Sequence, residues 1–138
     1  MTRFTEEALR AFLDAQGGLS RFWQPATDIH ETAEALVIRM EVAGATTETL
    51  SVTLSGDGEN LTISGTRGEP PGERAERVQC HQLEIYFGPF ERTFELPDGF
   101  QVDRDAITAT LKHGFLTIYL PERQQPAQPT RTIPIEME

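Results

Sequence analysis

Alternation of apolar and polar side chains with a period of two is the feature that most restricts how this chain can fold. In residues 36–43, Leu36, Ile38, Met40 and Val42 occupy every second position. Successive residues of a strand point to opposite faces of a sheet, so this spacing is typical of a half-buried β-strand. By the same reasoning we expect further strands at residues 50–54, 61–63, 81–87, 90–96, 107–111 and 116–120.

Turn residues separate the expected strands. Residues 56–58 (Gly-Asp-Gly) and 112–114 (Lys-His-Gly) suit tight connections between neighbouring strands. Residues 67–79 contain Pro70-Pro71-Gly72 within a charged run, so we expect a long exposed loop there. Six or seven short strands without an intervening helical pattern predict an all-β fold, an immunoglobulin-like antiparallel β-sandwich.

The strand pattern covers residues 23–122, and two segments of different character flank it. Residues 1–22 form an N-terminal arm, in which residues 4–17 have the spacing of a short amphipathic helix. Residues 123–138 form a tail, whose prolines and polar residues suit a solvated, extended tether. With 138 residues and 38% apolar content, the chain suits one core rather than two.

The tail ends in an isolated apolar pair. Ile133 and Ile135 flank Pro134 in a polar segment that has no core of its own to bury them. At about 3.3 Å per extended residue, the tether can carry this pair roughly 35 Å. That distance is enough to reach another subunit, and we expect the pair to bind there.

The arm is rich in large apolar side chains. They can pack on the sandwich as an extension of its core, or they can offer an adaptable apolar surface to non-native proteins. Because the arm lies outside the strand pattern, we favour the second interpretation. The candidate client-binding residues are Phe4, Leu9, Phe12, Leu13, Phe22 and Trp23.

Charge and cysteine content limit the classes of partner. The net charge is -10 and Lys112 is the single lysine, which argues against a nucleic-acid binder, because such binding needs clustered Lys and Arg. No stretch approaches the length of a membrane span, and the first residues lack the pattern of a secretory signal. The single cysteine, Cys80, fits a reducing compartment, so we expect a cytoplasmic protein.

The sequence holds no pattern typical of catalytic or metal-ligating residues. His30, His81 and His113 are scattered and have no metal-ligand spacing with Cys80. The acidic turn at Asp57 can suggest calcium, but the ligand ladder of a calcium loop is missing and a hairpin turn explains it. Nucleophile elbows and phosphate-binding glycine loops are missing too. We therefore expect no enzyme, no cofactor and no metal.

Arg92 stands out by its parity within residues 90–96. It shares a face with Phe90, Phe94 and Leu96, where a buried arginine needs a carboxylate or carbonyl partner. Alternatively, the strand is twisted near an edge and the side chain reaches water. We favour a role for Arg92 at a subunit interface.

Together these motifs resemble those of the small heat-shock proteins, the alpha-crystallin family, in its bacterial and archaeal type. The resemblance covers residues 23–122 and the tail. It is carried by Trp23-x-Pro25-x-x-Asp28-Ile29, by Leu-Thr-Ile-Ser-Gly at 61–65, by Gly88-x-Phe90-x-Arg92-x-Phe94-x-Leu96-Pro97, by Ala109-x-Leu111-x-His113-Gly114-Phe115-Leu116, by Leu120-Pro121 and by Ile133-x-Ile135.

The resemblance implies two kinds of contact between subunits. Ile133, Pro134 and Ile135 would bind a hydrophobic groove between two edge strands. That groove would be lined by Leu50, Val52, Leu54, Ile107 and Ala109. A homodimer would form where the strand after the long loop crosses to the partner's sheet. Its interface residues would be Arg92, Gln82, Leu83, Glu84, Ile85 and Tyr86.

The function that this resemblance implies is that of an ATP-independent holdase chaperone of the stress response. Such a protein is a dimer or larger homo-oligomer that binds unfolding client proteins and prevents their aggregation. The alternative is a CS-type co-chaperone adaptor, which binds a folded partner chaperone and needs no self-docking tail. A small hydrolase built from loop Ser, His and Asp residues is a third hypothesis that no motif supports.

Overall fold

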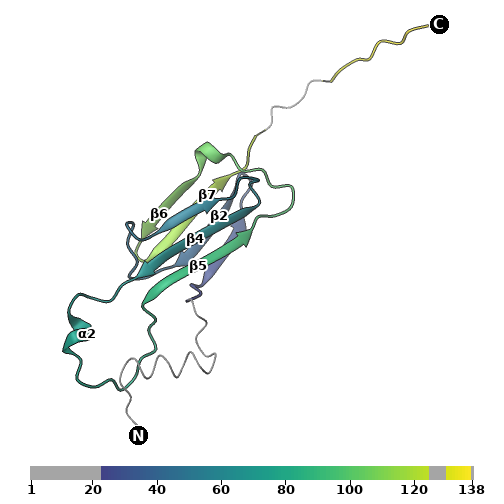
Figure 1. The fold of residues 1–138 in the computed structure, drawn as a ribbon. Coiled ribbons are helices and arrows are strands. Elements are labelled where there is room, and N and C mark those ends of the chain that lie inside the picture. The colour runs from purple at the N-terminus through teal and green to yellow at the C-terminus, as the bar shows by residue number, and fades with distance from the viewer. Residues whose placement is uncertain (1–22, 125–129, 138) are drawn as a thin grey trace.

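The computed structural model describes residues 23–124 and 130–137, and the described chain forms an antiparallel β-sandwich (Figure 1). Its strands are β1 (Thr27–Glu31), β2 (Ala35–Glu41), β3 (Ser51–Leu54), β4 (Asn60–Arg67), β5 (Gly88–Glu95), β6 (Thr108–Lys112) and β7 (Phe115–Pro121). The connections contain one short helix, α2 (Glu73–Glu76), and one 3-10 turn, η1 (Arg104–Ala106). The all-β sandwich that the sequence predicts is confirmed.

Two sheets form the two layers of the sandwich. One sheet has the strand order β1-β2-β7-β6 and the other has the order β3-β4-β5. All pairings between these strands are antiparallel, with Ile38 opposite Ile118 in the first sheet and Ile63 opposite Arg92 in the second. Because β2 pairs with β7 rather than with β3, the chain crosses between the layers after β2 and returns after β5.

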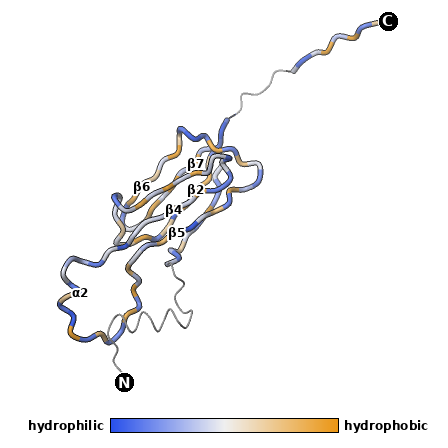
Figure 2. Tube along the Cα trace, in the orientation of Figure 1, coloured by the Kyte–Doolittle hydropathy of each residue, from blue (hydrophilic) through white to orange (hydrophobic). Residues whose placement is uncertain are grey.

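The hydrophobic core lies between the layers and follows the alternation in the sequence. In β2, Leu36, Ile38 and Met40 are buried, whereas Arg39 and Glu41 between and beside them are exposed. The buried core consists of Leu36, Ile38, Met40, Val42, Leu61, Ile63, Phe90, Leu96, Leu116, Ile118 and Leu120. Figure 2 shows apolar and polar residues interspersed along the strands, as expected when each strand buries one face.

Two arginines connect the layers at opposite sides of the sandwich. Arg104 donates through Nη2 to the carbonyl oxygens of Ser55 (2.6 Å) and Gly56 (2.8 Å), so the start of β6 lies beside the end of β3. Arg92 donates through Nη1 to the carbonyl oxygen of Pro25 (2.9 Å) and to Thr27 Oγ1 (3.3 Å), so β5 lies beside β1. One side of the sandwich therefore consists of the edges of β3 and β6, and the other of those of β5 and β1.

The long loop between β4 and β5 projects from one end of the sandwich (Figure 1). A hydrogen bond of 2.7 Å from Arg67 Nε to the carbonyl oxygen of Tyr86 closes its base. Within it, Arg77 and Glu73 of α2 form an ion pair at 3.6 Å. The sequence correctly predicts a long loop after residue 67 but gives no sign of α2, which is only one helical turn.

The strand predicted at residues 81–87 is wrong for the single chain, because these residues have no regular secondary structure. A strand exists only when its backbone groups pair with those of a neighbouring strand. The segment belongs to the projecting loop and pairs with neither sheet (Figure 1). The alternation in its sequence therefore suits a strand, but the strand forms only when another strand pairs with it.

The sequence predicts the turn between β6 and β7 but does not predict β1. β1 is not predicted, because it is a polar edge strand in which every residue after Thr27 is exposed. The β6–β7 turn is confirmed: His113 (φ 52°) and Gly114 (φ 79°) both have positive φ, as a two-residue type I′ hairpin requires. The helix predicted at residues 4–17 lies outside the described residues.

Candidate functional site

The β3–β6 edge is the part of the sandwich that best suits the binding of an extended segment. We use this name for the two neighbouring edge strands and for Leu50 and Ile107, which immediately precede them. Within the described residues, β3 pairs only with β4 and β6 pairs only with β7. Each strand therefore has one row of backbone N–H and C=O groups that no strand covers, and such a row can accept an additional strand.

Apolar side chains line the inner face of this edge. In β3, Val52 and Leu54 are half-buried, while Ser51 and Thr53 point outward and are exposed. The half-buried side chains that pack against the core here are Leu50, Val52, Leu54, Ile107 and Leu111. Of the five residues predicted to line the tail-binding groove, Leu50, Val52, Leu54 and Ile107 therefore pack against the core at this edge.

Ala109 and Leu111 differ from the predicted lining. Ala109 is exposed and is not among the side chains packed on the core. Leu111 is half-buried and has the same parity as Ile107 and Ala109, so it belongs to the same face of β6. Sequence reasoning missed Leu111, although the two-residue spacing from Ala109 was the signal that could have found it.

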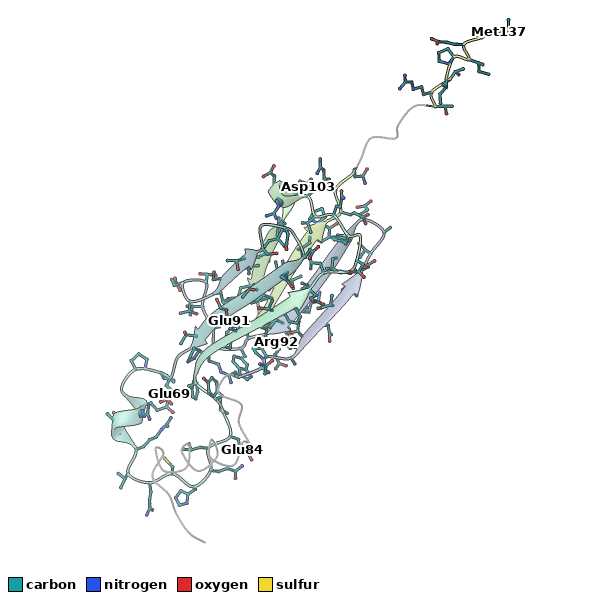
Figure 3. All side chains as sticks on the ribbon, turned by 45° about the vertical axis from the view of Figure 1, so that its right-hand side comes forward. Glu69, Glu84, Glu91, Arg92, Asp103 and Met137 are labelled. Atoms are coloured by element: carbon teal, nitrogen blue, oxygen red, sulfur yellow. The ribbon has the colours of Figure 1, made fainter. Side chains whose placement is uncertain are left out.

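The tail does not occupy the β3–β6 edge of its own chain. Residues 130–137 have no regular secondary structure, and all of them are exposed. The side chains of Ile133 and Ile135 are 76% and 97% exposed. In Figure 3, Met137 marks the end of this segment, well away from the strands. Docking of Ile133, Pro134 and Ile135 thus stays a prediction.

Arg92 has the parity that the sequence predicts, and its partners lie within the chain. It is half-buried on the same face of β5 as Phe90 and Phe94, and its guanidinium lies 4.8 Å from the centre of the Phe94 ring. Its hydrogen bonds go to Pro25 and Thr27. Figure 3 shows Arg92 near the edge of the sandwich where β1 begins. Its expected place in a dimer interface stays a prediction.

The other predicted interface residues lie in the projecting loop. Gln82, Glu84 and Ile85 are exposed, with Ile85 at 63%, while Leu83 and Tyr86 are half-buried. Figure 3 places Glu84 in this loop, outside the two layers. Tyr86 is held at the base of the loop, because its hydroxyl donates to the carbonyl oxygen of Pro89 at 3.0 Å. The loop tip, rather than its base, is therefore the part available to a partner.

Trp23 is the one candidate client-binding residue within the described part of the chain. Its ring packs edge-on against Phe90 at 5.3 Å between centroids and lies 6.4 Å from the Tyr86 ring. The guanidinium of Arg67 stacks on the indole at 3.6 Å. In this chain Trp23 is therefore half-buried and packs on the core, and its role in binding clients stays a prediction. Phe4, Leu9, Phe12, Leu13 and Phe22 lie outside the described residues.

Arg67 is an organising residue that sequence reasoning missed. Besides Trp23 and Tyr86, it contacts the carbonyl oxygen of Ala43 through Nη1 at 3.4 Å. Burial lowers the pKa of the Arg67 guanidinium, and the nearby charge of Glu41 opposes that shift. No local motif points to these contacts, because they join residues that are 19 to 44 positions apart in the chain.

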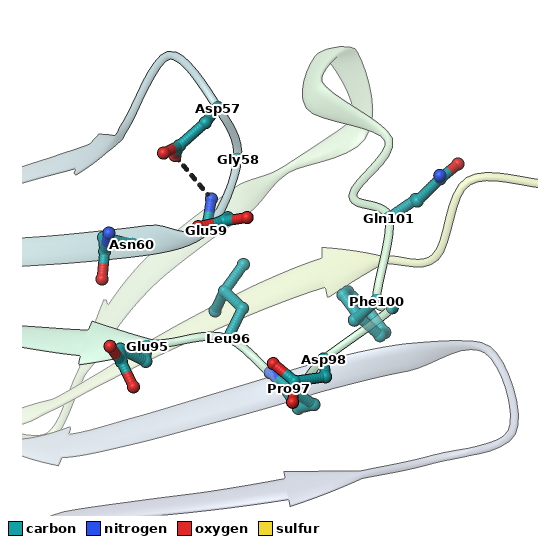
Figure 4. Close-up of a pocket in the computed structure, with 11 residues that line it drawn as sticks. Asp57, Gly58, Glu59, Asn60, Glu95, Leu96, Pro97, Asp98, Phe100 and Gln101 are labelled. Atoms are coloured by element: carbon teal, nitrogen blue, oxygen red, sulfur yellow. Dashed lines mark hydrogen bonds between the residues drawn. The ribbon is translucent and has the colours of Figure 1, made fainter.

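A pocket of about 330 Å³ lies between the β3–β4 turn and residues 95–101 (Figure 4). Asp57 at its rim accepts hydrogen bonds from Ser55 Oγ (2.6 Å) and from the backbone N–H of Glu59 (3.0 Å), and these bonds lower the pKa of the Asp57 carboxyl. The carboxylate of Asp57 thus accepts its hydrogen bonds from within the turn, in agreement with the interpretation of this segment as a hairpin turn rather than a calcium loop. In the described ranges, no group of three or more His, Cys, Asp or Glu side chains is placed to hold a metal ion.

Among the helices within residues 23–124 and 130–137, none has the length and apolar character needed to cross a membrane.

Comparison with known proteins gives a consistent result. A sequence profile described as the Hsp20/alpha crystallin family matches residues 28–136. Spore protein SP21 of Stigmatella aurantiaca is 38% identical over 107 residues, which cover 78% of this chain and 59% of that protein. Small heat shock protein C2 of Rickettsia felis is 32% identical over 101 residues, 73% of this chain and 62% of that protein. The match thus spans about three-fifths of the length of these relatives.

Solved structures resemble the fold at similar identity. The crystal structure of a small heat-shock protein from Xylella fastidiosa has a TM-score of 0.63 and 29% identity, and the match covers 83% of this chain and 97% of that one. The hspA protein of Xanthomonas axonopodis has a TM-score of 0.61 and 32% identity, with coverages of 73% and 95%. The arrangement of β1 to β7 is therefore one that known small heat-shock proteins share.

Proposed function

This chain belongs to the Hsp20/alpha crystallin family, and from that premise we propose that it is an ATP-independent holdase chaperone, which binds unfolding proteins and keeps them from aggregating. One observation carries the proposal: the same chain combines the family's sandwich, with two unpaired apolar strand edges side by side, and an exposed Ile-x-Ile tail. Within the described residues of the single chain, no strand covers the outer side of the apolar edge, and the isoleucines of the tail are exposed. Both therefore suit reversible association.

In this proposal the tail of one subunit binds the β3–β6 edge of another. Burial of two isoleucines contributes about 3 to 6 kcal/mol before costs are counted. Ordering the tail and joining two molecules offset much of this gain, although Pro134 already restricts the tail to extended conformations. A single tail thus binds weakly, and several tails acting together hold an assembly that still dissociates.

The proposal also assigns the dimer contact and the client contact. Residues 82–86 and Arg92 would form the homodimer interface, where residues 81–87 would pair as a strand with the partner's sheet. The exposed Ile85 supports this assignment, because a large apolar side chain exposed on a polar loop suits a contact with a partner. Phe4, Leu9, Phe12, Leu13 and Phe22 would bind clients, joined by Trp23 when its packing opens.

The surface charge suits a protein that keeps others dispersed. The net charge of -10 leaves complexes with unfolded clients strongly acidic, and mutual repulsion limits their growth. The mechanism needs no catalytic residue, nucleotide or metal. Free Cys80 is compatible with a reducing compartment, and we place the activity in the cytoplasm.

The direct test is suppression of aggregation. The full chain is mixed in stoichiometric amount with a heat-labile client, and light scattering is followed on heating without nucleotide. We expect scattering to fall strongly, because an apolar surface that binds the unfolded client competes with aggregation. The double variant Phe12→Ser/Leu13→Ser should lose much of this effect, whereas the matched arm variant Thr2→Ser/Gln16→Ser should retain it. Unchanged client aggregation in the presence of the full chain contradicts the proposed function.

A further inference from the structure

Two segments of the chain meet at one corner of the sandwich. Trp23 directly follows the N-terminal arm, and residues 86–87 lead from the long loop into β5, at the same end of the molecule (Figure 1). Arg67, the last residue of β4, contacts both. Its guanidinium stacks on the Trp23 ring at 3.6 Å, and its Nε donates to the carbonyl oxygen of Tyr86 at 2.7 Å. We call Trp23, Arg67 and residues 86–87 the Arg67 corner.

The shape of the guanidinium lets one side chain make both contacts. A guanidinium is planar, so its face can stack on an aromatic ring while its N–H groups donate in its plane. Arg67 offers its face to Trp23 and its N–H groups to the carbonyl oxygens of Tyr86 and, at 3.4 Å, of Ala43. Because these contacts fix a single orientation, loss of one of them lets the guanidinium turn and weakens the others.

Other contacts of Trp23 come from the base of the loop as well. Its ring lies 6.4 Å from the Tyr86 ring and 5.3 Å from the Phe90 ring. The ring of Phe87 lies 5.8 Å from the Arg67 guanidinium. Phe90 is held by the pairing of β5 with β4, whereas residues 86–87 have no regular secondary structure. Part of the packing of Trp23 therefore depends on where the loop base lies.

The position of the loop base depends on Gly88. This glycine has a φ of 145°, and a Cβ added to it would lie 2.8 Å from the hydroxyl oxygen of Tyr86. That hydroxyl donates to the carbonyl oxygen of Pro89 at 3.0 Å, so the ring of Tyr86 is folded against the backbone at the start of β5. A side chain at position 88 would therefore displace Tyr86 from the corner.

We propose that the Arg67 corner is an autoinhibitory contact, which keeps Trp23 packed while the base of the loop is in place and releases it when the base moves. This inference rests on the proposed function, in which Trp23 and the arm bind clients, and adds its regulation. Loops open at a lower cost than paired strands. On heating, the loop base therefore moves first, Trp23 follows, and an additional apolar contact for clients becomes available.

Fluorescence quenching in the full chain tests the coupling. Trp23 is the single tryptophan, so acrylamide quenching reports its exposure. Gly88→Ala displaces Tyr86 and should raise the quenching constant about twofold or more, as expected for contacts that share one side chain. Gly72→Ala is the matched control, because Gly72 also has positive φ but an added Cβ would meet no described atom within 4 Å. It should leave the quenching constant unchanged.

Substitution of Arg67 separates the coupling from a direct effect of Tyr86 on Trp23. Arg67→Met should itself raise the quenching constant, and Gly88→Ala should then add little, because the link is already lost. Arg67→Lys keeps the charge without the planar fork, so it should resemble Arg67→Met. The coupling is overturned if Gly88→Ala gives equal increments with and without Arg67, or none in its presence. An Arg67→Lys chain that behaves like the unchanged chain overturns the role of the guanidinium.

The reciprocal measurement is independent of whether Gly88→Ala folds. Trp23→Leu should speed amide hydrogen exchange at residues 83–88 about twofold or more, because the loop base loses part of its packing. Residues 70–77, at the far end of the loop, serve as the internal control and should be unaffected. In an Arg67→Met background, Trp23→Leu should add little. Unchanged exchange at residues 83–88 overturns the coupling.

Client protection distinguishes failure of this inference from failure of the proposed function. Arg67→Met should suppress aggregation of a heat-labile client from a lower temperature than the unchanged chain, because Trp23 is already released. If the unchanged chain protects the client and Arg67→Met is no better, the autoinhibitory role is wrong and the proposed function stands. If neither protects the client while quenching shows the coupling, the proposed function is wrong and the link between loop and Trp23 stands.

Discussion

Arg67 joins three parts of the chain that lie far apart in the sequence. Its guanidinium stacks on Trp23 at 3.6 Å, and it donates hydrogen bonds to the carbonyl oxygens of Tyr86 (2.7 Å) and Ala43 (3.4 Å). It thereby holds Trp23, the first described residue, and the base of the long loop at the same corner of the sandwich. An aliphatic substitute can provide the packing but none of the donors.

Arg67→Met should lower the free energy of unfolding by about 1 to 3 kcal/mol, the sum of one cation–π contact and two hydrogen bonds at a partly exposed site. Trp23 is the only tryptophan, so its fluorescence reports on this corner, and its emission should move to longer wavelength as the ring becomes exposed. Urea unfolding followed by fluorescence measures both effects. Arg39→Met, on the exposed face of β2, should change neither.

Asp57 should give the β3–β4 turn a pH-dependent stability. Hydrogen bonds from Ser55 and Glu59 lower the pKa of its carboxyl below the usual value of 3.8. The stabilisation is therefore fully present above that value and is lost as the pH falls through the lower pKa of the folded state. Asp57→Asn should reduce the urea midpoint well above pH 3.8, and the difference from the unchanged chain should shrink well below it. Asp98→Asn serves as the control, and a difference independent of pH contradicts the assignment.

At the scale of elements, the β6–β7 hairpin depends on its two turn residues. His113 and Gly114 both have positive φ, and a Cβ on Gly114 would lie 3.2 Å from Ala43 Cα. Gly114→Ala should therefore destabilise the protein by about 1 to 3 kcal/mol in urea unfolding. Gly56→Ala, which meets no atom within 4 Å, should have little effect. Equal effects of the two substitutions would show that the turn geometry is not limiting.

His113→Asn tests the same turn in the stabilising direction. Asparagine followed by glycine is the preferred pair for a type I′ hairpin, because asparagine adopts positive φ more readily than most residues. We expect the urea midpoint of His113→Asn to equal or exceed that of the unchanged chain. A clear loss of stability contradicts the turn type.

The elements differ in how far the sequence predicts them, for physical reasons. β2 is predicted because it is buried between two strands and its inner face is apolar throughout. β1 escapes prediction because it is an exposed edge strand, whose residues face solvent and carry no alternation. Residues 81–87 carry the alternation of a strand but belong to neither sheet of the described chain, and sequence periodicity contains no information about which strand would pair with them.

The candidate site, too, is predicted from the sequence only in part. Val52, Leu54 and Ile107 are found by parity, because alternation tells which side chains face the layer opposite. The juxtaposition of β3 and β6 depends instead on Arg104, which reaches carbonyl oxygens 48 and 49 positions earlier in the chain. No local pattern reveals that contact. The resemblance to small heat-shock proteins implies that these two edges lie together, and the hydrogen bonds of Arg104 are the physical cause.

At the scale of the whole molecule, the two open sides of the sandwich are separated. The β3–β6 edge and the side where Arg92 reaches Pro25 are opposite each other, so a tail and a dimer partner can be bound at the same time without competing. In the proposed function, separate sites would allow an assembly to lose its tail contacts on heating while its dimers persist. The arm residues and the β3–β6 edges of such dimers would then supply the apolar surface for clients.

The mass of the assembly tests the central claim most directly. Light-scattering mass measurements of the full chain, of Ile133→Ser/Ile135→Ser and of the matched tail variant Thr130→Ser/Thr132→Ser compare species that differ only in the apolar pair. If the tail of one copy docks on the edge of another, the isoleucine variant has a mass smaller by about twofold or more, because linked contacts are lost together, while the threonine variant matches the full chain. Identical masses for all three proteins would contradict tail-mediated assembly.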